Sequence, residues 1–421
     1  MSMGWIKTLI MSGLMLLCGC SMMALKEDLQ TAVKSGLALV QISNRDVNAS
    51  VILYLYKKSN EDVVLMEQRV SANHLPLIFI NPPDEYQLFI FEDRSNDGVW
   101  QLNESYAVAS PIWNNIVLRD SEKKAPTAED YAPTDIRLAP VINPRQNEIA
   151  ALAAALERQN ARLPNRFLQE STLADAKFSP DSIQLGAWQP LTFMNTIGYG
   201  FYLLEPLNPQ KIPVLFVHGI NDSPTTFSKT IEALDKERFQ AVFYHYPGSM
   251  ALEYSAYQLA QFVSRFCIAQ RSLVLPMVSH SMGGLVTRRM QQMLDNAPCK
   301  ISIPWWLSIS TPFAGHEGAR WGVETSPVIA PVWFDMTPGS AFLKNLEQPP
   351  ERNIPHHMVV SYGGAGRLAG ASNDGVVTVE SELADYVYDR ALSLTMVNEN
   401  HMDVLSAKRT LAKLQELQLI P

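Results

Sequence analysis

The sequence lacks the features that mark several large classes of protein. No cluster of lysine or arginine stands out along its 421 residues, and the formal net charge is −8, which argues against a nucleic-acid partner. Internal repeats and low-complexity tracts are absent. The sustained apolar run near the N-terminus, at residues 8–17, is too short to cross a bilayer as a stable helix.

Apolar residues, by contrast, are plentiful enough for a large core. They make up 47% of the chain, against 18% charged residues. A chain of this length is longer than one ordinary small domain, so two domains are expected.

The N-terminus has the pattern of a targeting segment rather than of a folded element. One basic residue precedes the apolar run, which ends in L-C-G-C-S at residues 17–21. This ending resembles the lipobox of bacterial lipoproteins, and the resemblance implies cleavage after Gly19, which makes residues 1–19 a signal peptide. Cys20 would then carry acyl chains that hold the protein on a membrane surface. By the same analogy, Ser21 favours the outer membrane of the cell envelope. An ordinary secretory signal and a chance apolar start are the alternatives.

Two of the four cysteines, Cys267 and Cys299, lie in the body of the chain. In the oxidising compartment that a lipoprotein signal implies, an even pair can form a disulfide. Sequence separation says nothing about geometry, so a bridge and two buried free thiols both remain open.

Residues 20–120 are predicted to form a small β-sandwich domain. Short segments rich in β-branched and aromatic residues alternate with turn clusters, a spacing typical of sandwiches. The predicted strands are 49–56, 63–70, 75–80 and 86–91. Residues 121–180 are predicted to be a linker, with several prolines and one Ala-rich helix at 148–159.

Residues 181–421 carry the pattern of an α/β domain. Short apolar segments alternate with helical patterns, which is typical of a doubly wound, mostly parallel sheet covered on both faces. The predicted strands are 212–217, 241–246, 273–278, 303–310, 357–362 and 391–397, and the predicted helices are 225–234, 251–266 and 285–294. Ligands bind such sheets at the carboxyl ends of the strands, where the motifs described next all fall.

The stretch V-S-H-S-M-G-G, residues 278–284, is centred on Ser281. It lies between a predicted strand and a predicted helix, which is the layout of a nucleophile elbow. The strained turn admits only small residues two positions before and after the serine, and Ser279 and Gly283 stand there. Glycine is usual at the first of these positions, so Ser279 is a departure. Ser281 is the predicted nucleophile.

A serine nucleophile needs a base within hydrogen-bond reach and a carboxylate that orients the base. In doubly wound hydrolases the chain order is serine, acid, histidine. Asp374, in S-N-D-G-V-V after the fifth predicted strand, is the predicted acid, and Asp335, Asp385 and Asp389 are weaker candidates. His401 is the predicted base, because it alone of the eight histidines follows Asp374.

Two backbone N–H groups are predicted to bind the oxyanion that develops during attack. One belongs to Met282, the residue after the nucleophile. The other belongs to Ile220, which follows the pair His218-Gly219 at the end of the first predicted strand of the α/β domain. His280, beside the nucleophile, is expected to pack against the elbow or to position it.

Five motifs, taken in order, resemble the α/β-hydrolase superfamily. They are P-V-L-F-V-H-G-I, S-H-S-M-G-G, I-S-T-P-F-A-G-H, S-N-D-G-V-V and N-H-M-D-V. The resemblance covers residues 212–421 and is nearest to lipase and esterase branches that include triacylglycerol lipases and GPI inositol-deacylase-like proteins. It implies hydrolysis of lipid or acyl esters through an acyl-enzyme on Ser281, Asp374 and His401, a chemistry that needs no cofactor and no metal.

An apolar, aromatic insertion at residues 315–346 is predicted to form a cap. Its bulky residues are Trp321, Val328, Ile329, Val332, Trp333, Phe334 and Met336. In the related enzymes this region helps to form a cap or an acyl pocket. Ordinary packing of a cap on the core accounts for the composition equally well.

Residues 93–104, D-R-S-N-D-G-V-W-Q-L-N-E, match the oxygen-ligand spacing of a calcium loop. A predicted strand enters this loop where an EF-hand has a helix. Comparable loops occur in transthyretin-like β-sandwich domains, which the segment resembles weakly. A metal-free hairpin turn is favoured over a calcium site.

Three alternatives to ester hydrolysis remain. The same triad could transfer acyl groups between lipids, or it could cleave amides or thioesters. The protein could instead be a non-catalytic envelope protein that binds through its β-sandwich, although the ordered motif set argues against this. The expected partners are an acyl-ester or lipid substrate and a membrane reached through the lipid anchor; the sequence indicates no oligomeric state.

Overall fold

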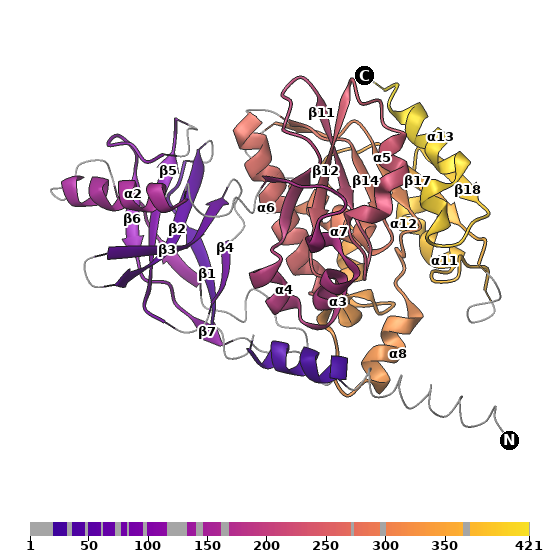
Figure 1. Ribbon diagram of the computed structural model, residues 1–421, viewed down its shortest axis with the longest axis horizontal. Helices are drawn as coiled ribbons and strands as arrows, with labels where there is room; N and C mark the ends of the chain where they lie inside the picture. The colour runs from indigo at the N-terminus through magenta and orange to yellow at the C-terminus, as the bar shows by residue number, and fades with distance from the viewer. Residues whose placement is uncertain are drawn as a thin grey trace.

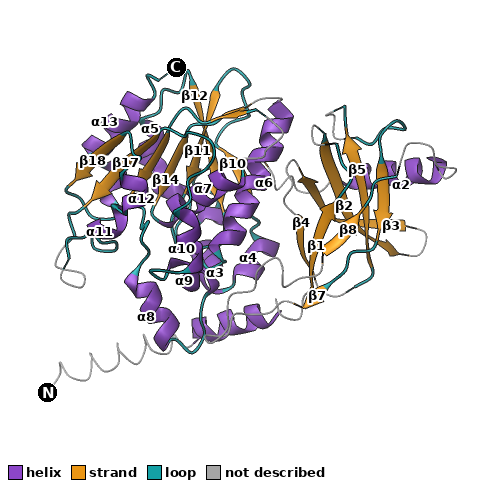
Figure 2. Ribbon diagram, turned by 180° about the vertical axis from the view of Figure 1, so that it is seen from behind, coloured by secondary structure: helices purple, strands orange, loops and turns teal. Residues whose placement is uncertain are grey.

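The computed structural model describes residues 20–31, 36–46, 49–59, 62–71, 77–81, 84–95, 99–115, 133–139, 146–160, 168–270, 273–294, 300–364 and 371–420. The chain forms two bodies of structure: two four-stranded sheets with one helix, and one eight-stranded sheet with helices on both faces (Figure 1, Figure 2). The predicted signal peptide and Cys299 lie outside the described residues.

The first body consists of the two four-stranded sheets. One has the order β4-β1-β7 with β8 parallel to β1, and the other has the antiparallel order β3-β2-β5-β6. The strands are β1 (Gly36–Ile42), β2 (Ser50–Ser59), β3 (Asp62–Ser71), β4 (Leu77–Asn81), β5 (Tyr86–Asp93), β6 (Tyr106–Ala109), β7 (Asn114–Asn115) and β8 (Pro133–Ile136). Strand β8 lies within the predicted linker, which the structure therefore corrects. Proline is tolerated as its first residue, where no ladder hydrogen bond is needed from it.

Strand β2 is buried on both faces, which explains its nearly continuous apolar sequence. Alternate side chains, beginning at Val51, pack with those of β1 between the two sheets. The intervening side chains, beginning at Ile52, pack beneath helix α2 (Gln146–Asn160). Successive side chains of a strand point to opposite faces, so one strand serves both layers.

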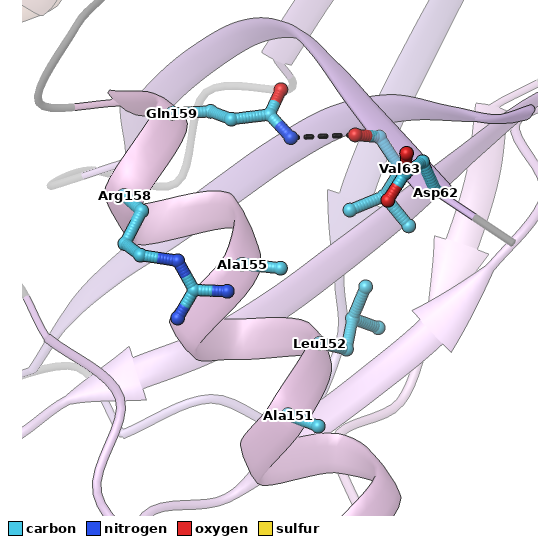
Figure 3. A pocket seen from close by; sticks show the side chains of 7 residues that line it. All are labelled: Asp62, Val63, Ala151, Leu152, Ala155, Arg158 and Gln159. Carbon is cyan, nitrogen blue, oxygen red and sulfur yellow. Dashed lines mark hydrogen bonds between the residues drawn. The ribbon is translucent and has the colours of Figure 1, made fainter.

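Helix α2 also covers the open edge of β3. The side-chain nitrogen of Gln159 donates to the carbonyl of Val63 at 2.5 Å, and its side-chain oxygen accepts from the N–H of Leu65 at 2.8 Å (Figure 3). One glutamine thus takes the place of a neighbouring strand. Unpaired edge strands invite association with other chains, and this pairing blocks part of the edge.

The second body is centred on one mostly parallel sheet of order β18-β17-β16-β14-β11-β12-β10-β9, in which β10 runs antiparallel to β12. The strands are β9 (Leu168–Glu170), β10 (Gly200–Leu203), β11 (Ile212–Val217), β12 (Phe239–His245), β14 (Met277–His280), β16 (Trp306–Ile309), β17 (His356–Ser361) and β18 (Ser393–Val397). Strands β13 (Leu273–Val274) and β15 (Ile301–Ser302) form a short separate pair. The mostly parallel α/β sheet expected from the sequence is present.

Helices cover both faces of this sheet. Leu215 of β11 faces the apolar cluster around α6 and α7, and its neighbour Phe216 faces the cluster around α5 and α13. The helices are α3 (Pro180–Trp188), α4 (Pro190–Thr196), α5 (Ser228–Glu232), α6 (Leu252–Gln270), α7 (Met282–Met293), α8 (Glu317–Thr325), α9 (Pro331–Met336), α10 (Ala341–Leu346), α11 (Val379–Glu382), α12 (Asp385–Tyr388) and α13 (Lys408–Leu417), with single turns η2 (Ala176–Phe178), η3 (Pro224–Phe227) and η4 (Asp403–Ser406). Within the described ranges, no helix is both long and apolar enough to cross a membrane.

The eight-stranded sheet begins earlier in the chain than the predicted boundary at residue 181, because β9 already pairs with β10. The predicted strand at 273–278 is split into β13 and β14, with Pro276 between them. Cys267 takes part in a disulfide, which leaves the free-thiol alternative untenable for that residue. Its predicted partner Cys299 is not described, so the pairing itself stays a prediction.

Residues 20–31 form a helix that packs on the second body rather than on the sheets that follow it in the chain (Figure 1). Leu25 is fully buried in the cluster around α6 and α7. The carboxylate of Asp28 accepts from the N–H groups of Leu191 at 2.8 Å and Thr192 at 3.1 Å, in the first turn of α4. Helix α4 has no side-chain cap of its own, so Asp28 caps it from a distant part of the chain.

The two bodies also meet where β3 contacts α6. The guanidinium of Arg69 donates to Oε1 of Gln258 at 2.9 Å and to the hydroxyl of Tyr199 at 2.9 Å. From the other side, Arg265 donates to Oε1 of Gln68 at 3.0 Å. Directional hydrogen bonds from both partners therefore fix how β3 lies on α6.

Asp28→Ala should lower the stability of the second body by about 1–2 kcal/mol, because it leaves the first turn of α4 without its cap. The measurement is the thermal unfolding midpoint of the full chain, followed by intrinsic fluorescence. Glu27→Ala is the matched control, since Glu27 is an exposed neighbour in the same helix. Equal midpoints for the two variants would show that the contact to α4 contributes nothing.

Candidate active site

Ser281 stands at the turn between β14 and α7 with φ 53° and ψ −131°. A positive φ is uncommon for a residue with a side chain and costs about 1–3 kcal/mol. Backbone contacts hold the turn in place: the N–H of Ser281 donates to the carbonyl of Ile309 at 2.9 Å, and its carbonyl accepts from the N–H of Gly284 at 2.9 Å. This is the geometry of a nucleophile elbow.

Close packing around the turn explains the small residues beside Ser281. A Cβ atom at Gly283 would lie 2.3 Å from a backbone carbonyl oxygen of β11, and one at Gly219 would lie 2.9 Å from the Cβ of Ser281. Ser279 is fully buried where glycine is usual, and its Oγ accepts from Nε1 of Trp306 at 2.8 Å. The departure from glycine is therefore matched by a hydrogen-bond donor on β16.

His401 bridges Ser281 and Asp374. Its Nε2 lies 2.9 Å from Oγ of Ser281, and its Nδ1 lies 2.6 Å from Oδ2 of Asp374. An ionised carboxylate can only accept, so Nδ1 carries the proton and Nε2 presents a lone pair to the serine hydroxyl. All three side chains are buried. The structure thus brings together the residues predicted as nucleophile, base and acid.

Each oxygen of Asp374 receives two hydrogen bonds. Oδ1 accepts from the N–H groups of Val376 at 2.9 Å and Val377 at 2.7 Å. Oδ2 accepts from His401 and from the hydroxyl of Ser361 at 2.6 Å. Burial works to raise the pKa of Asp374, but its hydrogen bonds and the nearby His401 outweigh burial and hold that pKa below its usual range. A carboxylate held this way stays ionised and can orient the imidazole.

Ser361 connects Asp374 to a second buried carboxyl group, which sequence reasoning missed. The N–H of Ser361 donates to Oε2 of Glu382 at 3.2 Å, and its Oγ lies 2.5 Å from Oγ of Ser310. Because Ser361 donates its hydroxyl proton to Asp374, Ser310 must donate to Ser361. Burial, and then the charge of Asp374, raise the pKa of Glu382 well above its usual range. These contacts join β17, α11 and the residue that follows β16, so no local sequence motif could have predicted them.

The two predicted oxyanion donors lie beside the nucleophile. Met282 is the first residue of α7, so its N–H has no acceptor within the helix. The side chain of Ser281 does not cap that helix end, where the dipole favours negative charge. Ile220 directly follows Gly219, whose backbone packs against Ser281.

The weaker acid candidates have other roles or surroundings. Asp335 is buried, and its Oδ2 accepts from the N–H of Leu252 at 2.7 Å, which caps the start of α6. Asp385 and Asp389 are exposed at the two ends of α12. Neither the buried position of Asp335 nor the exposed positions of Asp385 and Asp389 bring a carboxylate to His401.

The predicted cap consists of the three helices α8, α9 and α10. Val332 and Met336 are buried in the core of the second body, and the ring of Trp333 covers Gly322. Trp321, in contrast, is 69% exposed. Packing on the core accounts for the buried cap residues, and it leaves Trp321 in solvent.

A surface hollow between α2 and β3 lies in the first body, apart from this site (Figure 3). It is lined by Asp62, Val63, Ala151, Leu152, Ala155, Arg158 and Gln159. The lining has no serine, cysteine or histidine, so it offers no nucleophile with a base.

The loop at residues 93–104 is organised by its own glutamate. Oε1 of Glu104 accepts from the N–H of Arg94 at 2.8 Å, and Oε2 accepts from the N–H of Gln101 at 3.0 Å. These contacts turn the carboxylate toward loop amides, as in a hairpin turn, while residues 96–98 are not described. No group of three or more histidine, cysteine or acidic residues placed to hold a metal occurs in the described part of the chain.

The sheet, the elbow and the order of the triad define the class of protein. A mostly parallel sheet covered by helices carries a serine on a strained strand-to-helix turn, and Ser281, Asp374 and His401 follow one another in that chain order. These are features of the α/β-hydrolase fold, which the second body therefore has.

No family model and no curated protein matches the chain. Among solved structures, the mature form of the Bacillus licheniformis lipase BlEst2 is 18% identical, over 52% of this chain and 97% of that one, with a TM-score of 0.42. A carboxylesterase of the thaumarchaeon Nitrososphaera gargenis is 11% identical over 51% and 92%, with a TM-score of 0.35. The Pyrococcus furiosus esterase Pf2001 is 16% identical over 50% and 83%, with a TM-score of 0.33. Likenesses at this level do not decide the activity, which rests on the site.

Asp374→Asn should lower kcat on a p-nitrophenyl ester by about 10⁴-fold while the protein stays folded, because an amide cannot hold His401 in the productive tautomer. Circular dichroism checks the fold, and Asp385→Asn, which removes an exposed carboxylate, is the control. A kcat within tenfold of the parent would place the orienting acid elsewhere.

Glu382→Gln should stabilise the protein increasingly as pH rises above about 4.5, the ordinary pKa of a glutamate. The folded state keeps Glu382 protonated while the unfolded state releases the proton, so the parent loses stability with rising pH and the amide does not. The measurement is the difference between the two unfolding midpoints from pH 4 to pH 8. A difference that stays constant across this range would mean that Glu382 is ionised in the folded protein.

Proposed function

We propose that this protein is a serine hydrolase that cleaves carboxylic esters, with lipid or acyl esters as its substrates. The observation that carries the proposal is the hydrogen-bonded line from Asp374 through His401 to Ser281, with distances of 2.6 Å and 2.9 Å. An unassisted serine hydroxyl is a poor nucleophile near neutral pH. This arrangement supplies both the base and the carboxylate that such a nucleophile needs.

In the first half of the reaction, Oγ of Ser281 attacks the ester carbonyl carbon and Nε2 of His401 takes the hydroxyl proton. Asp374 stabilises the imidazolium that forms, and the N–H groups of Ile220 and Met282 donate to the oxyanion. His401 then gives the proton to the departing alkoxide oxygen as the ester C–O bond breaks. The acyl group remains on Ser281, and the alcohol leaves.

In the second half, water attacks the acyl-enzyme and His401 again acts as the base. Collapse of the second tetrahedral intermediate returns the proton to Ser281 and releases the carboxylic acid. Proton transfer and oxyanion binding are all carried by groups of this chain, so neither half calls for a cofactor or a metal.

The cap and the chain start support an acyl or lipid substrate. The exposed indole of Trp321 on α8 offers an apolar surface, and the lipobox-like sequence before Ser21 supports lipidation of Cys20, which is exposed. We propose that residues 1–19 are removed and that the acyl chains on Cys20 hold the protein on the bacterial outer membrane. The substrate would then be met at a lipid surface.

The proposed domain organisation follows the packing. A β-sandwich domain comprises β1 to β8 with α2, in which the two sheets enclose one apolar cluster. The hydrolase domain comprises the chain from β9 onward together with the helix at residues 20–31.

The test is a panel of p-nitrophenyl acyl esters of increasing chain length, together with labelling of Ser281 by a fluorophosphonate probe. Ser281→Ala should lower kcat by at least about 10⁴-fold and abolish labelling, because the nucleophile is lost. Ser406→Ala is the matched control, since Ser406 is an exposed serine on η4. Preference for longer chains would identify the acyl ester as the substrate class.

Other results of the same test would replace the proposal. Full activity of Ser281→Ala would remove Ser281 as the nucleophile, and a parent protein that the probe leaves unlabelled would favour a non-catalytic binding role. A product formed with an added alcohol in place of water would indicate acyl transfer. Faster turnover of matched amides or thioesters would change the bond that is cleaved.

A further inference from the structure

His280 holds the loop that carries the catalytic base. Its Nε2 lies 2.9 Å from the backbone carbonyl oxygen of His401, and the two imidazole rings have centroids 4.8 Å apart. A carbonyl oxygen only accepts, so Nε2 of His280 carries a proton and donates it. In a neutral imidazole the other nitrogen, Nδ1, is then left with a lone pair.

That lone pair faces a carboxyl group. Nδ1 of His280 lies 3.9 Å from Oδ2 of Asp222, in the loop after β11. Both atoms are buried, and neither has a hydrogen-bond partner in the described part of the chain. The other oxygen of Asp222 accepts from the N–H of Ser223 at 2.8 Å. Two facing acceptors repel each other, so the pair is satisfied only when one proton lies between them.

The surroundings decide which partner holds that proton. Burial raises the pKa of Asp222 to about 6, against the hydrogen bonds from Ser223 and the side chain of Thr226 and the charge of His401. Tyr246 also interacts with Asp222: burial, and then the charge of Asp222, raise the pKa of the Tyr246 hydroxyl. The carboxyl group therefore carries the proton in mildly acidic solution and loses it near neutral pH.

Three charged or titratable groups face His280 besides Asp222. They are His401, Asp374 and His218. Burial, with the neighbouring His401, lowers the pKa of His280 to about 3. The imidazole of His280 therefore stays neutral, and the change of charge with pH falls on Asp222.

We propose that Asp222 is a second acidic positioning residue of this site: when protonated it holds His280, and through His280 the backbone of His401, and when ionised it stabilises the imidazolium form of His401. The inference rests on the proposed hydrolase function. Asp222 touches neither Ser281 nor the reacting carbonyl carbon. It acts on the base through His280, whereas Asp374 holds Nδ1 of His401 directly.

The ionised form of Asp222 has a defined effect on the pH profile. A negative charge close to His401 favours the protonated imidazole over the neutral one. A neutral residue in its place removes this preference. The acid limb of kcat/KM, which reports the base in the free enzyme, therefore moves to lower pH when the charge is removed.

Asp222→Asn separates charge from shape. The amide keeps an oxygen for the N–H of Ser223 and presents a nitrogen donor toward Nδ1 of His280, so the contact between the two side chains survives without the charge. We expect the acid-limb midpoint to fall by about half a unit or more, with KM nearly unchanged. Asp222→Ala, which also removes the contact, should in addition lower kcat by about tenfold. Asp235→Asn, at an exposed position, is the matched control.

The readout is the rate at which a fluorophosphonate labels Ser281 between pH 5 and pH 8, measured beside kcat/KM on an ester. A midpoint of Asp222→Asn below that of the parent supports the proposal. An unshifted or raised midpoint, with labelling reduced equally at every pH, overturns it in favour of a purely structural aspartate. If the probe does not label the parent protein at all, the proposed hydrolase function is wrong. This result differs from an unshifted midpoint, so a failure of the proposal about Asp222 and a failure of the proposed function can be told apart.

Discussion

The active site depends on one backbone constraint, which holds Ser281 in a conformation that residues with side chains avoid. Relaxing its φ of 53° would swing the hydroxyl away from Nε2 of His401, which lies only 2.9 Å away. The strain of about 1–3 kcal/mol is offset by the surrounding sheet, because hydrogen bonds from two sides pin the turn. The same crowding removes side chains at Gly219 and Gly283 and turns the hydroxyl of Ser279 toward Trp306. The elbow and the small residues around it are therefore one feature.

Three carboxyl groups lie in or next to the site: Asp374 contacts His401, Glu382 is joined to Asp374 through Ser361, and Asp222 faces His280. Asp374 receives four hydrogen bonds and stays ionised. Glu382 has the N–H of Ser361 on one oxygen, while its other oxygen has no partner in the described residues, and burial raises its pKa well above the usual range. The pKa of Asp222, about 6, lies between the lowered pKa of Asp374 and the raised pKa of Glu382. Burial opposes the charge of each of them, and only Asp374 has enough donors and nearby positive charge to outweigh it.

The sequence predicts those features that short motifs and the ends of apolar strands indicate. Ser281, Asp374 and His401 each follow an apolar strand, so a parallel sheet brings them to one edge. Asp222, Ser361 and Glu382 acquire their roles only from contacts across the fold, and no local pattern marks them. Strand β8 begins at Pro133 and is short, so the sequence predicts a linker there, and the three-residue β9 has no apolar period to detect. The sequence thus predicts the candidate reacting groups, which the structure brings together, but not the groups that hold them.

The helix at residues 20–31 has a consequence for where the enzyme can work. Only five positions separate Cys20 from Leu25, which is fully buried in the apolar core of the second body. At 1.5 Å per helical residue, that separation is about 7.5 Å, so lipid on Cys20 would give the catalytic domain almost no tether. Such an enzyme cannot sample the bulk solvent or reach a facing membrane. Its rate would follow the two-dimensional density of substrate in its own leaflet, and diluting the substrate with inert lipid would slow it even at constant total concentration.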